Sequence, residues 1–205
     1  MSTSFSKKHW EQVYTQKQAD EVSWYQKKPT VSLSMIQSIS SPRDRVIDIG
    51  GGSSSLVDHL LVLGYDKLAV LDIAQQAIQQ IQKRLAEKAN HVEWYIDDIT
   101  QFVPPHPYEV WHDRAVFHFL MDQTLRAAYV DVLKKTLTPG GYVVMATFGK
   151  GGPKRCSGLD IVQYDERMMQ NELGDEFILL NSQYESHVTP AGKEQRFIYL
   201  TFLRQ

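Results

Sequence analysis

Residues 46–55, Val-Ile-Asp-Ile-Gly-Gly-Gly-Ser-Ser-Ser, decide the fold of this chain. The first four residues are apolar and β-branched except for Asp48, as in a short central strand that is covered on both faces. Three glycines then let the backbone turn sharply and approach a ligand without a Cβ in between. One of the three serines caps a helix whose apolar residues recur from Leu56 to Leu63. A strand, a glycine turn and a helix N-terminus together predict the nucleotide-binding crevice of an open α/β sheet.

The residues around the glycines indicate which ligand this crevice takes. A dinucleotide fingerprint requires a third glycine where the chain has Ser55, and no lysine follows the glycines as in a phosphate-binding P-loop. Asp48 lies two residues before the first glycine, and its carboxylate repels a phosphate but suits a cationic ligand with an ammonium group. S-adenosylmethionine carries both a sulfonium and an amino group. The alternative is a glycine turn that binds no ligand.

The rest of the chain alternates between strand and helix patterns. Four further strands are expected at 67–71, 91–96, 108–111 and 142–148, with amphipathic helices between them. This alternation predicts a parallel, doubly wound sheet. Two last strands, 177–184 and 196–202, flank a Thr-Pro-Ala-Gly turn and predict an antiparallel hairpin.

Acidic residues follow two of these strands. Asp72 ends the second strand, 72 − 50 = 22 residues after Gly50, where a carboxylate accepts hydrogen bonds from a ribose diol. Asp97 and Asp98 follow the third strand; Asp98 is expected to accept from an adenine amino group, with Ile99 beside the ring. The alternatives are a helix-capping role for Asp72 and a metal or acid–base pair at 97–98.

Residues 1–44 precede the first strand and carry two helical patterns, at 8–17 and from Thr30. A polar loop between them contains Trp24 and Tyr25, and adjacent aromatic side chains in a polar loop need a surface to cover. We expect these two residues to close a cap over the crevice. For the helices themselves, the favoured interpretation is an ordinary layer that packs on the sheet.

Five motifs in order resemble those of the class I S-adenosylmethionine-dependent methyltransferases: 48–52, Asp72, 97–99, 111–114 and 137–141. The resemblance covers about residues 40–150. It implies a seven-stranded Rossmann-like sheet with helices on both faces and the last strand antiparallel. It also implies S-adenosylmethionine as the cofactor, S-adenosylhomocysteine as the product and no metal. The cofactor-binding residues are then Trp24, Tyr25, Asp48, Gly50, Gly51, Gly52, Ser53, Ser54, Asp72, Ile73, Asp97, Asp98, Ile99, Asp113 and Arg114.

The N-terminal aromatic residues, at 10–14 and 23–25, look like those of a small methyltransferase branch that acts on small thiols or metalloids or on protein lysines. Ser53 and Ser54 depart from the glycine or threonine of many relatives. Methyl transfer depends mainly on positioning and exclusion of water, and a base is needed only when the nucleophile arrives protonated. The candidate catalytic residues are Asp113, His118 and His187, with His112 and Cys156 as weaker ones.

Composition bounds these expectations. The chain has 205 residues, 42% hydrophobic, a net charge of −2 and one cysteine, which suits one domain with an N-terminal cap (1–44) and a catalytic core (45–205). Neither nucleic acid nor a membrane is expected as a partner, and the N-terminus lacks a signal-peptide pattern, so a cytoplasmic protein is predicted. The expected acceptor is a small molecule. A protein lysine and a non-catalytic, cofactor-binding subunit remain as alternatives, and the oligomeric state stays open.

Overall fold

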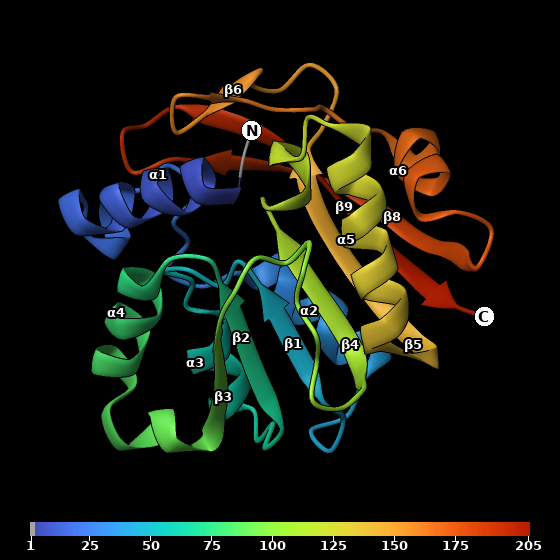
Figure 1. Cartoon of the computed structure of the whole chain (residues 1–205), viewed down its shortest axis with the longest axis horizontal. Coiled ribbons are helices and arrows are strands. Elements are labelled where there is room, and N and C mark those ends of the chain that lie inside the picture. Colours follow the sequence, from blue (N-terminus) through green and yellow to red (C-terminus); the bar gives the residue numbers. More distant parts are fainter. Residues whose placement is uncertain (1–2) are drawn as a thin grey trace.

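The computed structural model describes residues 3–205, with side chains from Lys7 onward, so the first two residues of the predicted cap lie outside it. Seven strands form one sheet in the order β3-β2-β1-β4-β5-β9-β8 (Figure 1). Their bounds are β1 Val46–Ile49, β2 Leu68–Asp72, β3 Val92–Ile96, β4 Tyr108–Arg114, β5 Leu137–Phe148, β8 Phe177–Val188 and β9 Glu194–Arg204. The first five strands are parallel, and β9 runs antiparallel to both neighbours. The predicted seven-stranded sheet is confirmed.

The strand order reverses beside β1. Asp48 on β1 is level with Val70 on β2 and with His112 on β4, so three strands end at the same edge of the sheet. Consecutive connections leave β1 in opposite directions at this point, which opens a crevice outside the carboxyl ends of the strands. The glycine turn, Asp72 and Arg114 all follow or end these strands.

Helices cover both faces of the sheet. One face carries α2 (Thr30–Ile39), α3 (Leu56–Val62) and α4 (Gln75–Leu85), whose apolar residues share a core with Val46, Val70 and Val110. The other face carries α5 (Gln123–Thr136) and α6 (Glu166–Leu173), packed on a second core around Trp111. The helix at Thr30–Ile39 therefore belongs to the ordinary layer on the sheet rather than to a cap.

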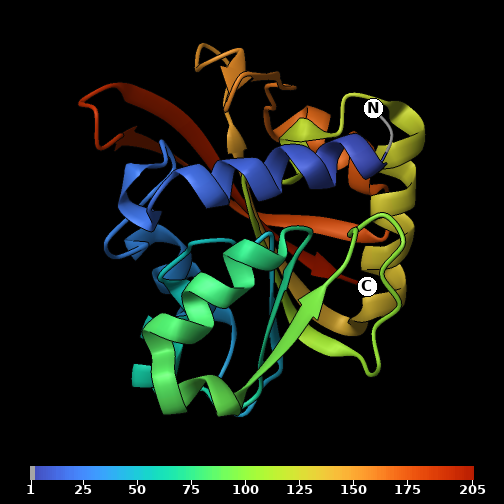
Figure 2. The ribbon, with the colours of Figure 1, turned by 60° about the vertical axis from the view of Figure 1, so that its left-hand side comes forward.

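A third layer lies over the carboxyl edge of the sheet. It contains α1 (Thr3–Gln16), the short helix Ala19–Glu21 with the loop after it, and a small hairpin of β6 (Arg155–Cys156) and β7 (Leu159–Asp160). Figure 2 shows α1 crossing above the strand ends, with the β8–β9 hairpin reaching past the sheet toward the N-terminal segment. Two residues of α1 attach it to α4: the Glu11 carboxylate accepts from the backbone N–H groups of Gln75 and Gln76, and the backbone carbonyl of Tyr14 accepts from the Gln80 side chain.

Some element boundaries differ from those expected. Strands β4, β8 and β9 extend beyond their predicted ends, and the predicted turn at 138–141 is a bulge inside β5. The register shows the bulge: Leu137 pairs with Tyr108, whereas Tyr142, five residues later, pairs with Val110, only two residues later. The loop predicted at 149–158 includes the strand β6. This strand was not predicted because β6 and β7 have two residues each, too few to show an alternation of apolar and polar residues.

No helix within residues 3–205 combines the length and the apolar character that crossing a bilayer requires.

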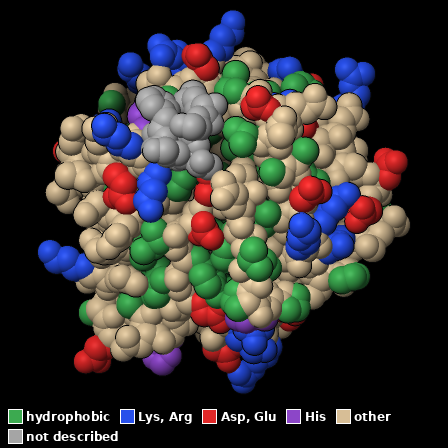
Figure 3. Space-filling view, viewed as in Figure 1, with side chains coloured by type: hydrophobic (Ala, Val, Ile, Leu, Met, Phe, Trp, Pro, Cys, Tyr) green, Lys and Arg blue, Asp and Glu red, His purple; other side chains and the backbone are tan. Residues whose placement is uncertain are grey.

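On the face shown in Figure 3, acidic and basic side chains are mixed around the edge, in keeping with the net charge of −2.

Candidate functional site

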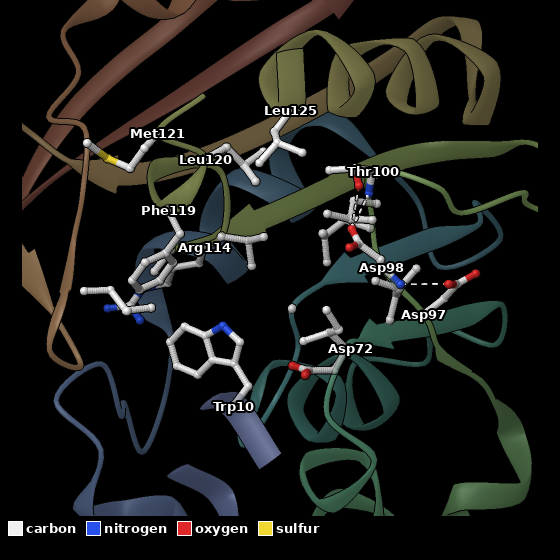
Figure 4. Close-up of a pocket in the computed structure, with 18 of the residues that line it drawn as sticks. Trp10, Asp72, Asp97, Asp98, Thr100, Arg114, Phe119, Leu120, Met121 and Leu125 are labelled. Carbon is white, nitrogen blue, oxygen red and sulfur yellow. Dashed lines mark hydrogen bonds between the residues drawn. The ribbon is translucent and has the colours of Figure 1, made fainter. Parts of the chain in front are cut away.

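A cavity of about 370 Å³ opens at the carboxyl edge of the sheet, beneath α1 (Figure 4). This volume is within the usual range of small-ligand sites. Acidic and polar residues from the ends of β2 and β3 line one side, and apolar residues that follow β4 line the other. Eight residues predicted to bind the cofactor line it: Trp24, Gly50, Asp72, Ile73, Asp97, Asp98, Ile99 and Arg114.

Asp72 is buried at the end of β2, with 5% of its surface exposed, and reaches the cavity. Its Oδ1 accepts from the backbone N–H of Ala74 at 2.8 Å, so the helix-capping role is present as well. Burial raises the pKa of Asp72 to about 7, partly offset by hydrogen bonds from the N–H groups of Ala74 and Gly52. The nearby acids Asp48 and Glu11 add to the rise of this pKa. A ligand that donates hydrogen bonds to this carboxyl stabilises its ionised form and lowers its pKa.

At two positions the glycine turn combines a positive φ with a lack of room for a side chain. Gly50 has φ of +61°, and a Cβ there would lie 2.0 Å from Cγ2 of Val116. Gly52 has φ of +44°, and a Cβ there would lie 2.3 Å from the hydroxyl of Tyr14. Gly52 lines neither cavity, but its lack of a side chain lets Tyr14 and Asp72 meet over the turn.

Asp97 and Asp98 form the polar end of the cavity (Figure 4). Asp97 Oδ1 accepts from the Asp98 N–H, and Asp98 Oδ1 accepts from both the N–H and the hydroxyl of Thr100, at 2.8 and 2.7 Å. These bonds fix the loop through one carboxylate oxygen of Asp98, Oδ1. Among residues with described side chains, no group of three metal-ligating residues occurs here or elsewhere.

A smaller cavity, of about 30 Å³, adjoins the main one and shares Trp24, Gly50 and Arg114 with it. It is lined by the remaining predicted cofactor residues except Gly52 and Asp113, namely Tyr25, Asp48, Gly51, Ser53 and Ser54. Asp48 is buried there and accepts from His112 Nδ1 at 2.6 Å through Oδ1. Its Oδ2 has no hydrogen-bond partner among the described residues. A buried carboxylate oxygen without a donor is costly, so this oxygen is a candidate ligand contact.

Arg114 lies where the two cavities join. Its Nε donates to the Tyr199 hydroxyl at 2.8 Å and its Nη1 donates to the Trp24 carbonyl at 2.7 Å. The guanidinium stacks on Phe197, 4.5 Å from the ring centre. Its Nη2 is buried without a partner among the described residues. The next residue, Ala115, has φ of +72° and turns the chain away from β4, which leaves the arginine side chain over the crevice.

Aromatic side chains roof the main cavity. Trp10 and Tyr14 of α1 line it, and Trp10 contacts Phe119 edge-on with ring centres 5.0 Å apart. Trp24 meets Trp10 and Tyr14 edge-on at 5.8 and 6.4 Å. Tyr25 lines only the small cavity. The aromatic cover thus comes mainly from the helix rather than from the predicted Trp24–Tyr25 pair.

Asp113 does not lie on either cavity. It is fully buried, and its two oxygens accept from the N–H groups of Val116 and Phe117 and from the Tyr129 hydroxyl, at 2.9, 3.1 and 2.6 Å. Burial raises its pKa to about 6, against these hydrogen bonds, which lower the pKa. These contacts hold the turn after β4, and the predicted roles of Asp113 in cofactor binding and as a base stay predictions.

The two candidate histidines also lie outside the cavity lining. His118 is fully buried, its Nδ1 accepts from the Phe148 N–H at 3.3 Å, and burial lowers its pKa to about 3. His187 bonds the Ser23 carbonyl at 2.8 Å through Nε2, and burial lowers its pKa. Cys156 is buried, and burial raises the pKa of its thiol to about 11. None of these groups is placed to take a proton from a molecule in the cavity.

Several lining residues were not identified from the sequence. Trp10 and Tyr14 were visible as one face of a helix, but nothing in the sequence located that helix over the crevice. A further apolar set was missed because it follows an irregular segment: Val116, Phe119, Leu120, Met121, Leu125 and Leu159. The chain after β4 forms the short helix Phe117–Phe119, which has too few residues to show a period.

Residues 47–143 match the family model of the methyltransferase domain. Among curated relatives, the eEF1A lysine and N-terminal methyltransferase of Bos taurus is 27% identical over 130 residues, which are 63% of this chain but only 17% of that relative. The chain therefore corresponds to a small part of that protein.

Two solved structures share nearly the whole fold. One is a structure described under the conversion of a disulfide bond into a thioacetal group during echinomycin biosynthesis. It has a TM-score of 0.79 and 14% sequence identity, and the match covers 97% of this chain and 93% of the other. The other is the N-methyltransferase NodS from Bradyrhizobium japonicum WM9 with S-adenosyl-l-homocysteine, at a TM-score of 0.71 and 17% identity, over 96% and 98%. At these identities the likeness shows the fold. Together with the family model over residues 47–143, it confirms the resemblance of this chain to the class I S-adenosylmethionine-dependent methyltransferases.

Proposed function

We propose that this protein binds S-adenosylmethionine in the paired cavities and transfers its methyl group to a small, soft nucleophile. One observation carries the cofactor half: buried polar atoms without partners, Asp48 Oδ2 and Arg114 Nη2, line the small cavity. Their charges are opposite, as are those of the amino and carboxylate groups at the methionine end of the cofactor. Binding there supplies both atoms with charge-assisted hydrogen bonds.

The main cavity suits the adenosine end. Asp72 lies beside Gly52 at the ribose position, and Asp98 with Ile99 lies farther along the same side. Trp24, Gly50 and Arg114, which line both cavities, then lie near the sulfonium, between the two ends of the cofactor.

The remaining side of the main cavity supports a soft acceptor. It is apolar, with Trp10, Phe119, Met121 and Leu159 among its residues. The acids lining the cavity are Asp72, Asp97, Asp98 and Asp122, and no histidine or lysine lines it within the described side chains. Asp72, Asp97 and Asp98 lie on the adenosine side, and Asp122 caps α5 by accepting from Thr124. A thiolate or metalloid nucleophile needs no base at this position, whereas a protonated amine does.

The second candidate is methylation of a protein lysine, favoured by the similarity to the eEF1A lysine and N-terminal methyltransferase. We take the edge-on contact between Trp10 and Phe119, which both line the cavity, to favour a small acceptor over a protein side chain.

Formation of S-adenosylhomocysteine from S-adenosylmethionine tests the proposal, with small thiols, arsenite and a lysine-rich protein offered separately. Turnover with a thiol or arsenite, and not with the protein, is the expected result. Label transferred only to the protein moves the assignment to a protein methyltransferase. Binding of the cofactor with no turnover on any acceptor class, in proteome as well, indicates a non-catalytic subunit.

A further inference from the structure

The C-terminal hairpin carries a polar chain that ends at Arg114. Tyr199 on β9 accepts from Arg114 Nε at 2.8 Å and donates to Glu185 Oε2 on β8, also at 2.8 Å. Tyr199 is fully buried. Burial raises its pKa to about 12, so the hydroxyl stays protonated and can fill both roles at once. Glu185 is the charged end of this chain.

The same hairpin fixes the loop that covers the small cavity. Glu185 Oε1 accepts from Gln26 Nε2 at 2.9 Å, and His187 bonds the Ser23 carbonyl. The Gln26 carbonyl accepts from the Ser55 hydroxyl at 2.9 Å, which ties the loop to the glycine turn. In Figure 2 the far end of the hairpin lies beside the N-terminal segment, in agreement with these bonds.

These contacts constrain the guanidinium on three sides. The Tyr199 hydroxyl accepts a hydrogen bond from Nε, and the Trp24 carbonyl accepts one from Nη1. The Phe197 ring lies against the guanidinium. A guanidinium is planar, so fixing two nitrogens also fixes the direction of the third. The free Nη2 therefore has a defined orientation before a ligand arrives, which reduces the entropy lost on binding.

We propose that Tyr199 and Glu185 are positioning residues that orient Arg114 Nη2 toward the carboxylate of the cofactor's methionine end. They touch no ligand themselves and act through Arg114. This inference rests on the proposed function, since it takes the carboxylate of S-adenosylmethionine as the group that Arg114 meets. It gives the C-terminal hairpin a part in cofactor selection that the methyltransferase motifs on β1 to β5 do not include.

The test compares two ligands that differ at the methionine end. S-adenosylhomocysteine has the amino-acid group, and methylthioadenosine has the same nucleoside without it. Tyr199→Phe and Glu185→Gln are each expected to weaken S-adenosylhomocysteine binding about tenfold, because a charge-assisted contact loses its alignment. Methylthioadenosine affinity is expected to change by less than about twofold, because its contacts are elsewhere.

Tyr164→Phe is the matched control, since Tyr164 is also fully buried but its hydroxyl has no partner among the described residues. It should leave both affinities unchanged. In an Arg114→Lys background, Tyr199→Phe should have no further effect. Equal losses for both ligands, or no loss in either variant, would overturn the positioning role. A wild-type chain that binds methylthioadenosine as tightly as S-adenosylhomocysteine would instead count against the proposed function.

Discussion

Asp48 and His112 form a buried pair across neighbouring parallel strands, with Asp48 Oδ1 2.6 Å from His112 Nδ1. His112 is held in turn by Ser32 of α2, 2.9 Å from its Nε2. The pair fixes one carboxylate oxygen and leaves the other, next to Gly51, without a donor: a Cβ on Gly51 would lie 3.1 Å from Asp48 Oδ2. The sheet thus presents a single, oriented acceptor at the small cavity.

Asp48→Asn should weaken the binding of S-adenosylhomocysteine by about tenfold, because the ligand's ammonium loses a charge-assisted acceptor. Methylthioadenosine, which has no ammonium, should bind as it does to the wild-type chain. Titration calorimetry with both ligands measures the effect. A parallel loss for both ligands would mean that the substitution disturbs the sheet rather than the contact.

The affinity for S-adenosylhomocysteine should depend on pH through Asp72. The free protein holds the pKa of this group near 7, whereas the ribose diol donates to, and so favours, the carboxylate. Binding therefore releases a proton, and affinity should rise about tenfold from about pH 6 to about pH 8. Calorimetry in buffers of different ionisation enthalpy detects that proton, and Asp72→Asn should flatten the profile. A wild-type profile that is flat would show that Asp72 meets no donor from the ligand.

The same pKa has a consequence for stability. An acid whose pKa is raised by folding destabilises the folded state progressively as pH rises from the unfolded pKa, here 3.8, to the folded pKa of about 7, and the loss is complete above that value. Asp72→Asn should therefore raise the melting temperature of the ligand-free chain at about pH 8, and raise it by less at about pH 5, where only part of this loss has developed. A lower melting temperature at both values would assign Asp72 mainly to capping α4 through Ala74.

Asp113→Asn should reduce stability and leave the pH dependence of turnover unchanged. Asparagine keeps one acceptor oxygen but puts an NH2 group in place of the other, which leaves a buried donor without an acceptor and costs about 1–3 kcal/mol of unfolding free energy. Urea denaturation measures the loss, and turnover per folded molecule should stay within severalfold of wild type. A loss of an ionisation from the pH–rate profile, at unchanged stability, would restore Asp113 as a base.

The N-terminal layer is expected to become more ordered when the cofactor binds. Trp10 and Tyr14 line the cavity, and the Glu11 carboxylate and the Tyr14 carbonyl join α1 to α4. Hydrogen exchange over residues 7–30, with and without S-adenosylhomocysteine, measures this. Slower exchange in the complex supports a lid, whereas equal exchange in both states identifies a static layer.

The crevice could be predicted from the sequence because its parts are local. The run from Val46 to Ser55 encodes strand, turn and helix start within ten residues, and the acid at Asp72 follows at a spacing fixed by one helix and one strand. The terminal hairpin was likewise signalled by the turn between its strands. Such features depend on neighbouring residues, so a single sequence contains them.

The remaining parts of the site depend on contacts between distant residues. Arg114 receives its orientation from Tyr199, 85 positions away, and Trp10 meets Phe119 across the cavity. Asp113 looked like a site residue because it precedes Arg114 at the strand end, yet side chains alternate along a strand, so the two point to opposite faces. The hydroxyl of Tyr129 on α5 donates a hydrogen bond to the Asp113 carboxylate, on the face of the sheet that carries the core around Trp111.

The central claim, that the paired cavities bind a methionine-linked adenosine, is tested most directly by calorimetry of the wild-type chain with S-adenosylhomocysteine, with NAD as the control and a chelator present throughout. We expect one site per chain for S-adenosylhomocysteine, much weaker binding to Asp48→Asn, and no heat from NAD. Binding of NAD without binding of S-adenosylhomocysteine or S-adenosylmethionine would contradict the account.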